Sequence, residues 1–72
     1  MVSMALINIT LNGEPREIPT AVDLPTLLEI FSLPSQRIAV ELNGSVLRRV
    51  DWPKTQVIDG DRVEVVHFVG GG

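Results

Sequence analysis

The sequence predicts an α+β fold in which one main helix packs on one face of a small mixed sheet. Apolar and polar residues alternate in several short segments, as in half-buried strands, whereas one segment repeats its apolar residues at helical spacing. Turn residues separate these segments, and their order is strand, strand, helix, strand, short strand, strand. With 72 residues, the chain is expected to form a single small domain.

The first two segments are expected to form a hairpin. Residues 6–11 alternate apolar and polar side chains and end at Asn12-Gly13, a pair typical of tight hairpin turns. The return segment, residues 14–19, contains Pro15 and Pro19, and proline cannot donate to the ladder of a sheet. The second strand is therefore expected to be short and to lie at an exposed edge.

The next segment has the signals of one amphipathic helix. Asp23 can cap free backbone amides, and Pro25 suits the first helical turn. Four apolar residues follow the spacing i, i+3, i+4, i+7, namely Leu24, Leu27, Leu28 and Phe31. Pro34 cannot continue a helix, so we expect the helix to end before it.

Two strands and an irregular connection are expected after the helix. Residues 38–42 alternate and close at Asn43-Gly44, which predicts another half-buried strand and a turn. Residues 46–50 predict a shorter strand, and Trp52-Pro53 is expected to begin an irregular connection. The second half of the chain therefore starts with a hairpin.

The last strand is the most β-prone segment of the chain. Val57-Ile58 leads into the turn residues Asp59-Gly60-Asp61, and residues 63–68 follow as a strand. A hairpin, a crossover helix and returning strands in this order predict the β-grasp, or ubiquitin-like, topology. In that topology the last strand lies inside the sheet, so it would give the C-terminus a fixed base.

The alternation of the last strand predicts an exposed apolar patch. If Val63 and Val65 face the helix, Glu64, Val66 and Phe68 lie on the opposite face of the sheet. Large apolar side chains in water beside the C-terminus indicate a surface where a partner docks. The alternative is a bulge that turns these side chains back into the core.

Composition and charge narrow the function classes. Apolar residues make up 44% of the chain and the mean hydropathy is +0.25, which indicates a globular protein without a membrane-spanning segment. The net charge is −3, and the six basic residues are scattered apart from Arg48-Arg49, so nucleic-acid binding is not expected. The start of the chain lacks the features of a secretory signal, which predicts a cytoplasmic location.

The chain offers no obvious catalytic or metal-binding residues. It has no cysteine, which excludes disulfides, thiolate metal sites and a cysteine nucleophile. The lone His67 has no visible co-ligands and is expected to be a structural or edge residue, so no metal site is expected. The sequence offers no cluster of acid, base and nucleophile, so a stand-alone enzyme is not expected.

The C-terminus is the most informative feature of the sequence. The chain ends at Val69-Gly70-Gly71-Gly72, a carboxylate at the end of residues without side chains. Four extended residues reach about 13 to 14 Å, and glycine should leave this arm disordered in the free protein. Such an arm fits the narrow active-site channel of a partner. The alternatives are a frayed end and a cut made in a linker.

These residues together resemble the ThiS family, the ubiquitin-like sulfur carriers of thiamine biosynthesis. The resemblance covers about residues 7–72 and is carried by short segments in the family's order and spacing. These segments are Asn12-Gly13, Leu27-Leu28-Glu29, Ile38-Ala39-Val40-Glu41-Leu42-Asn43-Gly44, Trp52, Asp59-Gly60-Asp61 and the terminal Gly71-Gly72. The resemblance implies a β-grasp domain over residues 7–69, an extension at residues 1–6 and a flexible tail at residues 70–72.

The resemblance also implies a chemical cycle centred on Gly72. A ThiF-like adenylyltransferase would use ATP and Mg²⁺ to adenylylate the Gly72 carboxylate, and sulfur derived from a cysteine desulfurase would convert it to a thiocarboxylate. Thiazole synthase, a ThiG-like enzyme, would take this sulfur for the thiazole ring. Gly70 and Gly71 would thread the tail, while Glu64, Val66 and Phe68 would dock the partner. The carrier itself would bind no cofactor and would be a monomer when free.

The absence of cysteine explains why sulfur in this cycle would attach to the terminal carboxyl group. Without a thiol, the protein cannot carry sulfur as a persulfide, so a carrier role requires the terminal carboxyl group. Glycine leaves the Gly72 carbonyl open to attack from either side, and Gly71 lets the backbone pass a constriction that a Cβ would block. Gly72 is therefore the expected site of sulfur attachment.

The match has two departures and leaves three alternatives. Residues 1–6 extend beyond the family's usual start, and the alternatives are that Met4 is the initiator or that the extension is a remnant of cloning. Ser32-Leu33 stands where the family often turns with glycine, so the helix end needs another cap. The alternatives are the small subunit of molybdopterin synthase, which uses the same thiocarboxylate chemistry, a ubiquitin-type protein modifier, and a stand-alone enzyme.

Overall fold

The computed structural model describes residues 5–68, and these form a mixed sheet with one main helix on one face, as predicted. The elements run in the order β1 (Leu6–Leu11), β2 (Glu14–Pro19), β3 (Val22–Asp23), α1 (Leu24–Ile30), β4 (Ile38–Leu42), β5 (Ser45–Leu47), the 3₁₀ helix η1 (Arg49–Lys54), β6 (Gln56–Val57) and β7 (Arg62–His67). Over the described residues, no helix is both long and apolar enough to cross a membrane.

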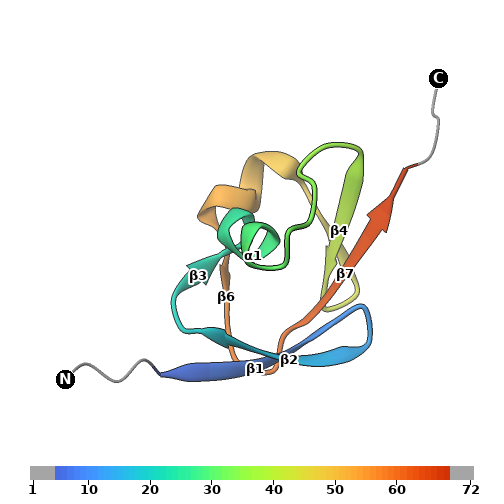
Figure 1. Ribbon diagram of the computed structural model, residues 1–72. Helices are drawn as coiled ribbons and strands as arrows, with labels where there is room; N and C mark the ends of the chain where they lie inside the picture. Colours follow the sequence, from blue (N-terminus) through green and yellow to red (C-terminus); the bar gives the residue numbers. More distant parts are fainter. Residues whose placement is uncertain (1–4, 69–72) are drawn as a thin grey trace.

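The last strand lies at the centre of the main sheet (Figure 1). The strand order is β2-β1-β7-β4-β5, and β7 runs parallel to β1 and antiparallel to β4. The first hairpin forms as predicted, with Leu6 opposite Pro19 and Leu11 opposite Glu14, and β2 is an edge strand. This arrangement is the predicted β-grasp topology, with the C-terminal strand held between two neighbours.

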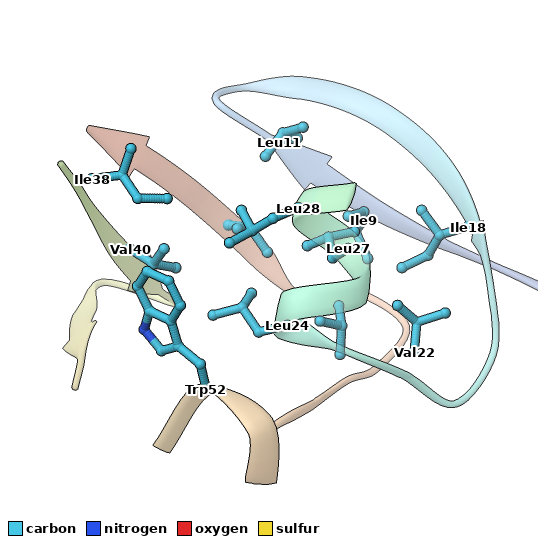
Figure 2. Packing of buried hydrophobic residues seen from close by; sticks show 12 residues of the cluster. Ile9, Leu11, Ile18, Val22, Leu24, Leu27, Leu28, Ile38, Val40 and Trp52 are labelled. Carbon is cyan, nitrogen blue, oxygen red and sulfur yellow. The ribbon is translucent and has the colours of Figure 1, made fainter. Parts of the chain in front are cut away.

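The helix begins and packs as its apolar spacing predicts. Asp23 is the N-cap, and its Oδ1 accepts the Thr26 N–H at 2.8 Å. Hydrogen bonds from the Thr26 side chain and then from its backbone N–H hold the pKa of the Asp23 carboxyl below the usual range. The side chains of Leu24, Leu27 and Leu28 are buried against the sheet (Figure 2).

Ser32 ends the helix in a conformation that usually requires glycine. Its φ is 55°, in the left-handed region. The Ser32 N–H donates to the carbonyl of Glu29 at 3.0 Å, and the Leu33 N–H donates to the carbonyl of Leu28 at 2.8 Å. This pair of bonds is a Schellman motif, and Leu33 packs against the core beside it. The helix end therefore has its cap, formed with serine at the position where glycine is usual.

The segment after β5 differs from the sequence prediction. A strand was predicted over residues 46–50, but β5 ends at Leu47 and Val50 lies in η1. The predicted irregular connection is instead this 3₁₀ helix, and Trp52 is buried in the core cluster that also contains Val40 and Leu24 (Figure 2). The indole Nε1 donates to the carbonyl of Leu47 at 3.1 Å, so burial of the ring ends the strand early.

Arg49 packs against the outer side of this tryptophan. Its guanidinium carbon lies 4.4 Å from the centre of the Trp52 ring, and its Nη1 donates to the carbonyl of Ser35 at 2.5 Å. A cation over an aromatic face contributes about 0.5 to 1 kcal/mol at an exposed site. The Arg48-Arg49 pair therefore includes one residue that joins η1 to the loop after α1.

A second, two-stranded sheet was not predicted. Val22 pairs with Val57 and Asp23 pairs with Gln56, so β3 and β6 form a short antiparallel ladder. Both valines are buried. Strands of two residues are too short for an alternation pattern to reveal them. This ladder fixes the start of α1 to the chain that leads into the last turn.

We expect Val40→Ala to destabilise the domain by about 2 to 3 kcal/mol, because it removes two methyl groups and leaves a cavity. Val46 on the neighbouring strand is the matched control, since its exposed fraction is 70% and that of Val40 is 0%. Val46→Ala should change the free energy of unfolding by less than about 0.5 kcal/mol. Urea unfolding measures both variants, and equal losses would contradict the assignment of the core.

We expect Ser32→Gly to raise the free energy of unfolding by about 0.5 to 1 kcal/mol, because glycine adopts the left-handed conformation without the strain of a Cβ. Ser35→Gly, in the following loop, is the control and should stabilise nothing. Thermal unfolding of the two variants would reveal the difference. A destabilised Ser32→Gly variant would show that the serine side chain has a role of its own.

Candidate functional site

The described chain ends at Phe68, immediately beyond the central strand. Gly70, Gly71 and Gly72, the predicted threading and reacting residues, lie outside the described residues. Their roles therefore stay predictions. The structure instead describes the part of the protein from which they extend, namely β7, its two neighbouring strands and the exposed side chains beside its end.

Two asparagines from the hairpin turns bind the backbone of β7. Asn12 donates its N–H to the carbonyl of Val63 at 2.8 Å, and its Oδ1 accepts the Val65 N–H at 2.7 Å. Asn43 donates its N–H to the carbonyl of Arg62 at 2.8 Å, and its Oδ1 accepts the Arg62 N–H at 2.8 Å. β7 is therefore fixed from both sides by turns that are far away in sequence.

Each of these asparagines occupies a backbone position that most residues avoid. The φ angles are 51° at Asn12 and 53° at Asn43, and each is followed by a glycine with positive φ. This is the geometry of the tight hairpin turn that the Asn-Gly pairs predicted. Asparagine tolerates it better than most residues and supplies a side-chain acceptor as well. One residue thus forms the turn and anchors the strand.

The turn before β7 is organised by the carboxylate of Asp61, which is buried. Its Oδ1 accepts from Asn43 Nδ2 at 3.0 Å, and its Oδ2 accepts the Ile58 N–H at 2.9 Å. The N–H of Gly60 donates to the carbonyl of Asn8 at 2.8 Å. A buried carboxylate with both oxygens bonded satisfies its polar groups, so Asp61 has a structural role here.

The end of β7 is bonded up to the last described residue. The Phe68 N–H donates to the carbonyl of Arg37 at 2.8 Å, which continues the ladder in which His67 pairs with Ile38. His67, which was expected to be a structural or edge residue, is exposed, and at its position β7 pairs with β4 alone. In residues 5–68, no three His, Asp or Glu side chains gather closely enough to hold a metal ion. The last described residues before Val69–Gly72 are thus hydrogen-bonded to the chain at the start of β4.

The side chains of β7 alternate as predicted. Val63 is fully buried and Val65 is partly buried against the core, whereas Glu64 is exposed. The exposed fractions of Val66 and Phe68 are 49% and 54%. The pairing with β4 runs without interruption from Val63 to His67, so no bulge turns these residues inward. The apolar patch exists, and its use for docking stays a prediction.

Sequence reasoning missed the residues that anchor β7. Asn12 and Asn43 were identified as turn residues and Asp61 as part of a turn, but their bonds to a strand elsewhere in the chain leave no local signal. Arg37 was not identified at all, because only its backbone carbonyl is used. Only the predicted strand order could have indicated that a polar side chain in one of these turns also bonds to another strand.

Comparison with known protein families gives one match over most of the chain. A model described as the ThiS family matches residues 9–72. Among solved structures, the crystal structure of the thiamine biosynthesis protein ThiS from Geobacter metallireducens is similar with a TM-score of 0.81 and 38% identity. That similarity covers 92% of this chain and 100% of the other. It supports the β-grasp fold independently of the strand order.

Curated relatives fall into three kinds. The uncharacterized protein ycf40 of Porphyra purpurea is 38% identical over 92% of this chain and 93% of its own length. The sulfur carrier protein ThiS of Bacillus subtilis is 35% identical over 64% of this chain and 70% of its own length. A thiazole synthase of Magnetococcus marinus is 36% identical over 92% of this chain, which spans only 20% of that longer protein.

We expect Asn12→Gly to loosen β7 while keeping the turn, because glycine adopts the positive φ but offers no acceptor to the Val65 N–H. The loss should be about 1 kcal/mol, with amide exchange at Val65 faster by about fivefold. Asn12→Asp keeps an acceptor and is the control. Hydrogen exchange followed by NMR measures both variants, with the Phe68 amide as internal reference. Unchanged protection at Val65 in Asn12→Gly would show that the side chain anchors nothing.

Proposed function

The chain belongs to the ThiS family, and from this membership we propose that it is a sulfur carrier protein of thiamine biosynthesis whose reacting group is the Gly72 carboxylate. The observation that carries the proposal is that the family match extends through residue 72 and so includes the diglycine end. The central, doubly anchored β7 supports it, because a terminus that enters a partner's active site benefits from a rigid origin.

The first step overcomes the low reactivity of a carboxylate. A partner adenylyltransferase of the ThiF type binds ATP with Mg²⁺, and a Gly72 oxygen attacks the α-phosphate. Pyrophosphate leaves, and the terminus becomes an acyl-adenylate. The carrier contributes the nucleophile and the slender arm, and the partner contributes the catalytic groups. The carrier is therefore a co-substrate in this proposal and catalyses no step itself.

The second step introduces sulfur. A sulfur nucleophile attacks the Gly72 carbonyl carbon, a carbon–sulfur bond forms, and the bond to the AMP oxygen breaks. With hydrosulfide, the products are the thiocarboxylate, AMP and a proton. With a persulfide derived from a cysteine desulfurase, an acyl disulfide forms first, and a thiol must then reduce it. Because the chain lacks cysteine, no side-chain thiol competes for the sulfur.

Docking and threading act together in this proposal. Ordering each residue of the arm costs about 1 to 2 kcal/mol. Burial of the exposed parts of Val66 and Phe68 in a partner can offset part of this at about 25 cal/mol per Å². Glu64, between them and the anchored start of β7, adds a charge to the docking surface. Gly70 and Gly71 then let the backbone pass where a Cβ would collide.

The relatives favour thiazole formation over the pterin branch as the destination of the sulfur. The similar structure is named as a thiamine biosynthesis protein, and a segment of a thiazole synthase resembles nearly the whole chain. We propose that thiazole synthase receives sulfur from this carrier. Donation of sulfur to a pterin precursor, as in molybdopterin synthase, would instead assign the chain to the alternative branch.

We expect incubation with the cognate adenylyltransferase, Mg-ATP and sulfide to exchange one oxygen for sulfur at Gly72. Intact mass spectrometry detects the exchange, and fragmentation locates it. A variant lacking Gly72 should fold with an unchanged unfolding temperature but gain no sulfur. A variant with one alanine appended after Gly72 is the control for chain length. Sulfur on any other residue, or no change with an adenylyltransferase that modifies a known carrier, would contradict the proposal.

A further inference from the structure

The outer face of the sheet is arranged in rows that cross β5, β4 and β7. The register places Val46 opposite Glu41, and Glu41 opposite Glu64, so these three side chains form one row. The next row contains Ala39 opposite Val66. Beyond it, Phe68 bonds to the backbone of Arg37 at the end from which the tail extends. A row with two carboxylates therefore borders an apolar surface.

The two carboxylates are an unfavourable pair in the free protein. Directly opposed residues on antiparallel strands have Cβ atoms about 4.5 to 5.5 Å apart, and like charges in that position repel. Arg62 lies on the same face as Glu64, two residues earlier on β7. Within residues 5–68, however, the one ion pair joins Arg16 to Glu14, on the hairpin edge, and so involves neither of these acids. The sheet thus keeps two acids in directly opposed positions, where like charges repel.

One guanidinium from a partner has the geometry to resolve this repulsion. It presents several N–H donors in a plane and can bond to two carboxylates at once, and it stacks readily on apolar and aromatic surfaces. The exposed Val46, Val66 and Phe68 side chains provide such a surface around the pair, with exposed fractions from 49% to 70%. A lysine would offer only a point charge and would not span both acids as well.

We propose that this face binds thiazole synthase through an arginine of that enzyme seated between Glu41 and Glu64, with Val66 and Phe68 packed beside it. This inference rests on the proposed function and names the partner chemistry of its docking surface. Relatives in which a similar segment belongs to the thiazole synthase polypeptide hold the two parts at high effective concentration. The occurrence of a similar segment within that enzyme favours thiazole synthase as the partner that this face binds.

Binding of the full, unmodified chain to purified thiazole synthase tests the proposal by calorimetry. Glu41→Gln and Glu64→Gln should each raise Kd about tenfold, equivalent to about 1.4 kcal/mol. The Kd of the double variant should rise by less than the product of the two single-variant factors, because one arginine bonds to both acids. Phe68→Ala should also weaken binding. Glu29→Gln, an exposed acid on α1, is the matched control and should leave Kd unchanged.

Three results would overturn the proposal. The first is a Kd for both glutamine variants equal to that of Glu29→Gln. The second is that the glutamine variants bind the adenylyltransferase more weakly but bind thiazole synthase unchanged, which would assign the face to the adenylyltransferase. The third is a lower unfolding temperature for the glutamine variants, which would give the acids a structural role. Failure of the wild-type chain to gain sulfur at Gly72 would instead refute the proposed function, since calorimetry uses the unmodified terminus.

Discussion

The backbone of β7 is shared between β1 on one side and β4 on the other, and the two Asn-Gly turns complete its bonding where the ladders begin. The pairing with β1 covers Arg62 and Val63, whereas β4 pairs with β7 as far as His67. The fold therefore holds the start of β7 from both sides and its end, before the C-terminal glycines, from the β4 side. The same strand also separates a face that packs on α1 from a face that is open to partners.

The domain reaches this rigidity with a small core. Leucines of α1, the aliphatic residues of the sheet and Trp52 form one cluster, in which the tryptophan is the largest side chain. A domain of this size buries only about 60% of its unfolded surface and has a thin margin of stability. Features that lower stability, such as Ser32 at positive φ and the opposed Glu41 and Glu64, are therefore informative. The serine is compensated by the Schellman bonds, whereas we assign the acids to a partner.

Local patterns were sufficient for much of the fold. The spacing of Leu24, Leu27 and Leu28 predicted the helix, and Asp23 predicted its start. The Asn-Gly pairs predicted both hairpin turns, and the predicted bounds of β2 were correct. The alternation of β7 also gave the exposed face. These features depend on residues that are close together in the sequence, so their patterns can be read without the structure.

The features that were missed depend on contacts between distant segments. The strand predicted over residues 46–50 was cut short because Trp52 folds inward and bonds to Leu47, and β3 and β6 exist only as partners of each other. The anchoring of β7 by Asn12 is another contact of this kind. At the site, the exposed patch was predictable from periodicity, but the row of Glu41 and Glu64 required the register of two strands.

The central claim is that sulfur travels on the terminus of this chain to thiazole. Carrier labelled with radioactive sulfur at its C-terminus, mixed with thiazole synthase and its small-molecule substrates, tests this claim in a single turnover. We expect the label lost from the protein to appear in the thiazole product in equal amount. Thiazole formed while the label remains on the protein would contradict it.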